Sequence, residues 1–214
     1  MNPMTQLRPP LSAADEATIL RALGGDQLLV MPTDTVYGIA SNPTSTPAVE
    51  ALLAAKGRGR DMPSPVLVDS VQTALELASD VPDWALRLMR QCWPGGLTLV
   101  FNRSEKARAY DLGDAPGTIA VRMPDHPLAL EILSLAGPLA VTSANLTGQP
   151  AATTCAQAQA YFGQHVSVYC DGGPTDGPIP STIVDATGAD PKILRTGVLS
   201  FEQIQSIISG TAGE

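Results

Sequence analysis

Three cations alternate with glycine in one short stretch of the sequence. Lys56, Arg58 and Arg60 are separated by Gly57 and Gly59. Because alternate residues of an extended chain face the same side, the three cations could line one wall, and glycine would let a ligand approach the backbone. Lysine offers a point charge and arginine a planar fork, and both suit phosphate groups. The pattern predicts either a polyphosphate-binding loop or a solvated basic turn.

A second candidate is the segment 118–123, in which apolar residues alternate with Thr118, Ala120 and Arg122. The apolar set fits a core. The opposite face would form a groove with a hydroxyl and a guanidinium about 13 Å apart, at roughly 3.3 Å per residue. We interpret this face as a groove for a ligand that carries a phosphate and a carboxylate, since small Ala120 leaves room. The alternative is a half-exposed strand with a surface arginine.

Three further polar clusters adjoin predicted strands, at the positions where open α/β sheets usually bind ligands. Each is also explained by a turn or a helix cap that satisfies its own backbone. The clusters are Thr33 and Tyr37 in the segment 32–38, Thr142, Ser143 and Asn145 in the segment 142–145, and Ser181 with Arg195 near the C-terminus.

Several common catalytic motifs are missing from the sequence. It contains no G-x-x-x-x-G-K-[ST] and no G-x-G-x-x-G after a strand, and Ser143 lies in Thr-Ser-Ala-Asn rather than in G-x-S-x-G. The two histidines, His126 and His165, have no metal-ligand spacing with a partner. We therefore predict no metal bound by protein ligands.

Composition limits the class of protein. The chain has 214 residues, 44% of them hydrophobic, and a formal net charge of −8, which predicts one folded domain and argues against bulk binding to nucleic acid or an anionic membrane. No apolar run approaches the ~20 residues of a membrane span. The three cysteines are widely spaced and no secretory segment opens the sequence, so we expect a cytoplasmic protein.

The elements that must position these residues alternate between helix and strand. Several connections look like hairpins, so we expect an α/β fold with a mixed sheet and flanking helices. We expect a flexible lead over 1–11, one domain over 12–209 and a tail over 210–214, with residues 36–40 extended or helical and 103–116 irregular. The predicted helices cover about 13–23, 47–55, 71–78, 83–91, 127–135, 154–162 and 200–208, and the predicted strands cover 27–31, 66–68, 97–101, 118–123, 139–142, 166–170, 182–185 and 192–195.

Taken together, the polar segments resemble the YrdC/Sua5 family of L-threonylcarbamoyladenylate synthases, over about residues 15 to 208. The resemblance implies a twisted, open α/β sheet with a positive central cavity. Seven motifs occur in the family's order: Pro-Thr-Asp-Thr-Val-Tyr-Gly at 32–38, Lys-Gly-Arg at 56–58, Pro-Gly-Gly-Leu-Thr at 94–98, Arg-Met-Pro at 122–124, Thr-Ser-Ala-Asn at 142–145, Ser-Thr-Ile-Val-Asp at 181–185 and Arg-Thr-Gly at 195–197.

The resemblance also implies a reaction. L-threonine, bicarbonate and ATP give threonylcarbamoyladenylate and pyrophosphate, and the product feeds the threonylcarbamoyl modification of adenosine 37 in tRNA. Mg²⁺ would accompany ATP, and the implied partner is the downstream threonylcarbamoyl transferase complex, met transiently, with weak or no tRNA contact and no membrane. The nucleophile, an N-carboxylate of threonine, is already anionic, so the site needs fixed cations rather than a strong base.

By the same resemblance, each candidate residue receives a role, and Lys56 and Arg58 would be the catalytic pair. The expected L-threonine contacts are Thr33, Tyr37, Arg122 and Ser181. The expected ATP contacts are Lys56, Arg58, Arg60, Thr118, Thr142, Ser143, Asn145 and Arg195.

The sequence departs from the family pattern in the basic loop and leaves two other functions open. Many relatives have proline after Lys-x-Arg, whereas Gly59 and Arg60 stand here, which predicts a more mobile loop. Longer relatives often carry a histidine where Leu67 falls, and some carry a second C-terminal domain, so we expect the short form. The alternatives are an RNA-binding module and a paralogue that uses carbamoyl phosphate or another acyl donor.

Overall fold

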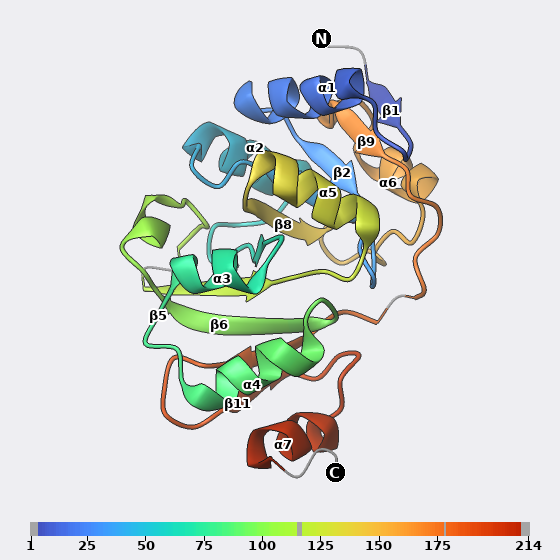
Figure 1. Cartoon of the computed structure of the whole chain (residues 1–214). Coiled ribbons are helices and arrows are strands. Elements are labelled where there is room, and N and C mark those ends of the chain that lie inside the picture. The colour runs from blue at the N-terminus through green and yellow to red at the C-terminus, as the bar shows by residue number, and fades with distance from the viewer. Residues whose placement is uncertain (1–3, 115–116, 178, 211–214) are drawn as a thin grey trace.

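A mixed β-sheet runs through the whole molecule, with helices on both faces (Figure 1). The computed structural model describes residues 4–114, 117–177 and 179–210. The strand order is β1-β9-β2-β3-β8-β4-β7-β6-β10-β11, and β5 pairs with β6 beside this path, so the predicted α/β class with an open mixed sheet is confirmed. The strands are β1 (Thr5–Leu7), β2 (Leu29–Met31), β3 (Gly38–Ser41), β4 (Val66–Leu67), β5 (Ala78–Ser79), β6 (Leu97–Arg103), β7 (Thr118–Arg122), β8 (Leu139–Ser143), β9 (Val168–Cys170), β10 (Thr182–Asp185) and β11 (Lys192–Arg195).

The helices lie close to their predicted ranges, and five of the seven α-helices in the described ranges begin at a capping side chain. Ser12, Ser45, Ser70, Thr154 and Ser200 each accept a hydrogen bond from a backbone N–H of the first helical turn. The helices are α1 (Ala13–Gly24), α2 (Thr46–Lys56), α3 (Val71–Leu77), α4 (Asp83–Cys92), α5 (Pro127–Ala136), α6 (Cys155–Phe162) and α7 (Phe201–Ser209), with 3₁₀ turns at Lys106–Ala109 and Gly163–His165.

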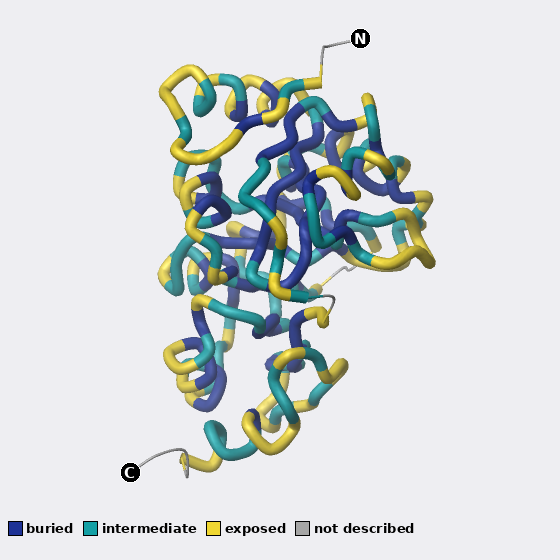
Figure 2. The backbone as a smooth tube through the Cα atoms, turned by 90° about the vertical axis from the view of Figure 1, so that its right-hand side faces the viewer, coloured by how far each residue is buried: buried dark blue, intermediate teal, exposed yellow. Residues whose placement is uncertain are grey.

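The central strands are apolar without a break because both of their faces are covered. In β2, Leu29 and Met31 pack into a cluster with residues of α1 and α5, while Val30 packs into the cluster that contains residues of α2 and α6. Figure 2 shows buried backbone gathered in the interior of the molecule, with exposed segments around its outer edge. The N- and C-termini lie at opposite ends of the molecule (Figure 1).

In β6 and β7, the alternation of side chains separates the core from the site. Leu99 and Val121 are paired neighbours and lie in the core. Thr98 and Arg122 are the next residues along and therefore face the opposite side of the sheet, where a cavity lies. The predicted alternation of segment 118–123 is thus present, with Arg122 at the last position of β7.

The predicted flexible lead is wrong for residues 5–7. Thr5–Leu7 form β1, which pairs in parallel with Val168–Cys170 of β9. Leu7 is buried in the α1–α5 cluster, and Gln6 donates a hydrogen bond from Nε2 to Asp171 Oδ2 at 2.9 Å. A strand of three residues is too short to show a periodic pattern in the sequence. It forms because its partner strand supplies its backbone hydrogen bonds. Of the predicted tail, residues 211–214 lie outside the described residues.

Other differences from the predicted elements are local. Residues 38–41 are extended, because β3 pairs antiparallel with both β2 and β8. The segment 103–114 contains the turn Lys106–Ala109 and the last residue of β6, and residues 115–116 lie outside the described chain. None of the helices within the described ranges has the length and apolarity that crossing a membrane requires.

Candidate active site

A cavity of about 390 Å³ lies on the face of the sheet to which Thr98 and Arg122 point. The β2–β3 loop, the C-terminal end of α2, the segment after β8, and the strands β7, β10 and β11 all contribute to its wall. Its described lining includes four cationic residues and no aspartate or glutamate, although the chain carries a net charge of −8. The cations are Lys56, Arg58, Arg122 and Arg195.

Lys56 ends α2 and anchors the segment that follows β8. Its Nζ donates to the backbone oxygen of Ser143 at 2.5 Å and of Asn145 at 2.7 Å, and to Asn145 Oδ1 at 3.3 Å. An ammonium has three protons, so all of them have acceptors in the protein. Burial and the charge of Arg58 lower the pKa of Lys56 to about 8.

Arg58 lies just beyond the end of α2, where Gly57 in the left-handed region turns the chain (φ 61°). Its Nη1 donates to Thr142 Oγ1 at 3.0 Å and its Nη2 to the oxygen of Pro63 at 3.2 Å. Its Nε is buried and has no partner among the described residues. Burial lowers the pKa of Arg58. Thr142 and Pro63 use two of the five guanidinium N–H groups, so one N–H on each Nη is left for an anionic ligand in the cavity that Arg58 lines.

The Ser143–Asn145 segment is held by its own side chains as well as by Lys56. Ser143 Oγ donates to Asn145 Oδ1 at 2.6 Å, and Asn145 Nδ2 donates to the oxygens of Leu146 and Gln149 at 2.9 and 2.8 Å. Both residues and Thr142 line the cavity, as predicted for the nucleotide side. The bonds also agree with the alternative of a self-satisfied turn.

Arg122 is held at three points by different parts of the chain. Its Nε donates to the oxygen of Gly95 at 3.0 Å, Nη1 to Thr35 Oγ1 at 3.0 Å, and Nη2 to Asp34 Oδ1 at 2.6 Å. A guanidinium has five N–H groups, so two remain, one on each Nη. Two parallel N–H groups match the two oxygens of a carboxylate.

The Thr33 hydroxyl belongs to a directed chain of hydrogen bonds that ends in its own turn. Thr33 Oγ1 lies 2.6 Å from the oxygen of Val36 and 3.1 Å from Thr35 Oγ1. Since Thr33 gives its proton to Val36, it accepts from Thr35, and Thr35 in turn accepts from Arg122. Thr33 lines the cavity, but its proton serves the β2–β3 turn.

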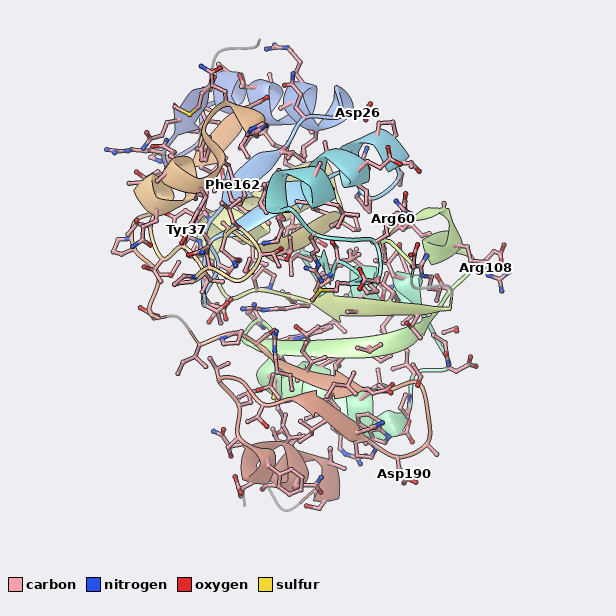
Figure 3. All side chains as sticks on the ribbon, turned by 180° about the vertical axis from the view of Figure 1, so that it is seen from behind. Asp26, Tyr37, Arg60, Arg108, Phe162 and Asp190 are labelled. Atoms are coloured by element: carbon pink, nitrogen blue, oxygen red, sulfur yellow. The ribbon has the colours of Figure 1, made fainter. Side chains whose placement is uncertain are left out.

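Tyr37 also lines the cavity, and its hydroxyl anchors the loop that follows β9 (Figure 3). It donates to the oxygen of Gly173 at 2.6 Å and accepts from the N–H of Gly172 at 3.3 Å. Burial and the nearby Asp171 carboxylate raise its pKa. This loop belongs to the segment between β9 and β10 that also contains Ser181 of the cavity lining. Tyr37 therefore holds the beginning of that segment.

Ser181 and Arg195 lie together in the part of the cavity wall that is formed by the β10–β11 region. Arg195 Nη2 donates to the Ser181 backbone oxygen at 2.9 Å and to its Oγ at 3.2 Å. Ser181 Oγ is 2.8 Å from the Oγ1 of buried Thr98. A cation thus touches a serine in the cavity wall, close to Arg122, whose pKa Arg195 helps to lower.

The cavity lining does not include two of the predicted ATP contacts, Arg60 and Thr118. Arg60 lies 2.8 Å from Asp111 and 3.4 Å from Asp114, and these carboxylates tether the loop expected to be mobile. Figure 3 labels Arg60 well away from Tyr37. Thr118 is the first residue of β7, and its backbone oxygen accepts a hydrogen bond from Arg103. The groove interpretation therefore holds for Arg122 alone.

Several lining residues had no role in the sequence interpretation. Thr98 stood within the Pro-Gly-Gly-Leu-Thr motif, which offered a signal, but its position depends on the pairing of β6 with β10. The apolar lining residues carried no chemical signal. The residues missed are Thr35, Val36, Gly38, Met62, Pro63, Pro65, Leu67, Thr98, Val141, Thr147, Gly148, Pro180 and Ile183.

The arrangement can bind two anionic groups and hold them near each other. Arg58 presents a buried donor at one wall, and Arg122 with Arg195 presents donors at another. Within the described residues, no group of three or more His, Cys, Asp or Glu side chains is placed to hold a metal ion.

Comparison with known proteins gives a consistent picture. A family model described as telomere recombination (Sua5/YciO/YrdC) matches residues 21–197. A Mycobacterium tuberculosis H37Rv protein is 50% identical to this chain over 187 residues, which is 87% of this chain and 86% of that protein; its provisional name is threonylcarbamoyl-AMP synthase. The threonylcarbamoyl-AMP synthase of Bacillus subtilis is 35% identical over 196 residues, covering 91% of this chain and 56% of that protein.

Solved structures agree with the sequence matches. Pyrococcus abyssi Sua5, crystallised with L-threonine, superposes with a TM-score of 0.86 at 33% identity, over 96% of this chain and 60% of that one. Escherichia coli YciO superposes with a TM-score of 0.81 over 95% of this chain and all of its own, at 22% identity. The second similarity supports the fold alone.

Proposed function

Since this chain belongs to the Sua5/YciO/YrdC family, we propose that it is a threonylcarbamoyl-AMP synthase, which converts L-threonine, bicarbonate and ATP into threonylcarbamoyladenylate and pyrophosphate. The observation that carries this proposal is the cavity with four cations and no carboxylate in its described lining. An acidic protein with a cationic cavity is suited to bind small anions and not an extended polyanion.

The amino-acid half of the cavity is the wall formed by Arg122, Ser181 and Arg195. The two unused N–H groups of Arg122 would bind the threonine carboxylate. The nearby hydroxyls of Ser181 and Thr98 would orient the remainder of the amino acid. The L-threonine present in the Pyrococcus abyssi structure supports this substrate.

The nucleotide half is the wall formed by Arg58 and the Thr142–Asn145 segment. The N–H groups of Arg58 that Thr142 and Pro63 do not use would donate to phosphate oxygens, while Lys56 keeps the backbone of the segment in place. Mg²⁺ would enter bound to ATP, since the described lining offers hydroxyls and no carboxylate. Its charge would offset that of the phosphates.

In the reaction, the chain's residues position two anions and stabilise charge. The threonine amine attacks the carbon of bicarbonate and water leaves, which gives an N-carboxylate; an oxygen of this N-carboxylate then attacks the α-phosphorus of ATP while pyrophosphate leaves. Arg122 fixes one reactant by its distant carboxylate, and Arg58 stabilises negative charge on the phosphoryl oxygens. No residue must act as a strong base, because the nucleophile is already ionised. We place this reaction in the cytoplasm, where ATP and tRNA are available.

The test is pyrophosphate release, with the nucleotide product identified by mass spectrometry. Release should require both L-threonine and bicarbonate. Arg58→Ala should raise the KM for ATP, and Arg122→Ala should raise the KM for threonine, each by about tenfold or more because a charged hydrogen bond is lost. Arg108→Ala is the matched control, since Arg108 is exposed and pairs with Glu105. Release that is independent of threonine would rule out the proposal.

A further inference from the structure

We infer that Asp34 is a positioning residue for the amino-acid half of the reaction: it holds the Arg122 guanidinium so that two N–H groups face the substrate carboxylate. This inference rests on the proposed function. Asp34 does not belong to the described cavity lining, and it therefore acts through Arg122. Neither the family match nor the sequence patterns assign it a role.

The Asp34 carboxylate joins two separate parts of the chain. Its Oδ1 accepts from Arg122 Nη2 at 2.6 Å and from the backbone N–H of Asp125 at 3.0 Å. Asp34 belongs to the β2–β3 loop, whereas Asp125 lies between β7 and α5. Because the same oxygen is also held by a backbone N–H, it would not move with the Arg122 guanidinium if that group rotated. The Asp34 carboxylate therefore favours one orientation of Arg122.

Asp34 is the charged member of the three acceptors that hold Arg122. Gly95 contributes a carbonyl and Thr35 a hydroxyl, which are neutral. The side chains of Arg122 and Asp34 are only 8% and 17% exposed, so water screens the pair little. Without Asp34, Arg122 would be a nearly buried cation whose described neighbours include a second cation, Arg195, that repels it.

The position of Arg122 in its strand makes this restraint necessary. It is the last residue of β7, its backbone is paired with Leu67 of β4, and its long side chain loses considerable rotamer freedom when it is fixed. Two neutral hydrogen bonds still leave the Nη2 end of the guanidinium without an acceptor. Asp34 supplies that acceptor and thereby presents the remaining N–H of each Nη to the cavity.

The experiment is steady-state pyrophosphate release by the full chain, with Asp34→Ala, Asp34→Asn and the control Asp125→Asn. Asp34→Ala should raise the KM for threonine about tenfold or more, with the KM for ATP unchanged within twofold. Asp34→Asn keeps a neutral acceptor, so its threonine KM should lie between those of wild type and Asp34→Ala. Asp125→Asn removes a neighbouring charge without altering the backbone N–H, so both constants should stay at the wild-type values.

A merely structural role predicts a different pattern. If Asp34→Ala raised both KM values together, or lowered kcat without changing the KM for threonine, the positioning role would be overturned. If Asp34→Ala fails to fold, Asp34→Asn still separates the two constants, and an unchanged threonine KM in that variant would refute the inference. Melting temperatures recorded with and without threonine identify any loss of fold.

The failure of this inference can be distinguished from the failure of the proposed function. If wild-type protein released no threonine-dependent pyrophosphate, the function itself would be wrong. If the function held but Arg122→Ala left the threonine KM unchanged, the assignment of the carboxylate to Arg122 would be wrong, and Asp34 would lose its role with it. An effect of Arg122→Ala without an effect of either Asp34 variant would refute the inference about Asp34 alone.

Discussion

The hydrogen-bond partners of each cation show whether it holds the protein together or has N–H groups left for a ligand. Lys56 spends its three protons on the Ser143–Asn145 segment, so it shapes the cavity wall. Arg58 makes two hydrogen bonds with its five N–H groups and keeps three, and Arg122 makes three and keeps two. The sequence identified Lys56, Arg58 and Arg122 as the central cations, but only contacts distant in sequence show which of them hold the protein and which remain for ligands.

Lys56 should make nucleotide use sensitive to alkaline pH. Burial lowers its pKa to about 8, so kcat/KM for ATP, which reports the free enzyme, should fall as pH rises through about 8. A neutral amine donates only two hydrogen bonds and holds the segment less firmly. The check is a pH profile of kcat/KM from pH 6.5 to 9.5. In Lys56→Arg this limb should vanish; an unchanged limb would assign it to another group.

The same group should affect stability in the opposite direction. Its folded pKa of about 8 lies below the ordinary value of 10.5, so between these pH values the unfolded chain binds more protons. The contribution of Lys56 to the free energy of unfolding should therefore rise across this window, while its cost is fully present below it. Urea denaturation of wild type and Lys56→Arg at pH 7.5 and 9.5 measures this contribution. The change in the free energy of unfolding from pH 7.5 to pH 9.5 should be more positive for wild type than for Lys56→Arg.

At the scale of elements, the ends of helices and strands place the chemistry. Gly57 stops α2 between Lys56 and Arg58, in a left-handed conformation that glycine adopts without strain. The sequence predicted α2 closely because the apolar helical spacing of residues 47–55 is a local signal; the structure adds the Ser45 cap. It did not predict β1 or β5, whose two or three residues depend on partner strands far along the chain.

Gly57→Ala should lower the free energy of unfolding by about 1 kcal/mol, the cost of a Cβ at positive φ. No atom lies within 4 Å of the added carbon, so the effect is conformational rather than steric. Urea denaturation measures it. Gly24→Ala, in helical backbone and also without near neighbours, is the control, and it should be neutral or stabilising by up to about 1 kcal/mol. Equal losses in both variants would contradict this account.

Gly197→Ala should disturb the wall that holds Arg195. A Cβ there would lie 2.1 Å from the Pro180 oxygen and 2.5 Å from the Ser181 carbonyl carbon, and backbone atoms cannot yield cheaply. We expect a loss of about 1–3 kcal/mol in stability and a higher KM for threonine. Thermal melts and kinetics test this against Gly188→Ala, which has open space. A normal threonine KM would show that Ser181 lies outside the amino-acid site.

At the scale of the whole molecule, charge is distributed unevenly. The net charge is −8, yet the cavity lining collects four cations and no described carboxylate. Composition alone excluded bulk binding to polyanions, but it could not show that residues from 33 to 195 converge on one cavity. The ordered motifs predicted that convergence, and the strand order, with β8, β4 and β7 at the centre, explains it physically.

Binding to tRNA should be weak, because the exposed surface of an acidic chain repels a polyanion. At about 0.15 M salt, we expect no complex at micromolar protein in a filter-binding or anisotropy assay, while ATP binding by the same preparation serves as the positive control. Tight tRNA binding that weakens steeply with salt and needs no ATP would favour the RNA-binding alternative.

The strand order has a consequence for folding during synthesis on the ribosome. β6 ends at Arg103 but acquires its parallel partner β10 only at Thr182, and β9 must first return to β1 and β2. On a ribosome adding about 5–20 residues per second, the β6 edge therefore waits on the order of ten seconds for its neighbour. Ser181 and Arg195 are among the last described cavity residues to emerge, so a nascent chain has no complete cavity and consumes no ATP before Arg195 has left the ribosome.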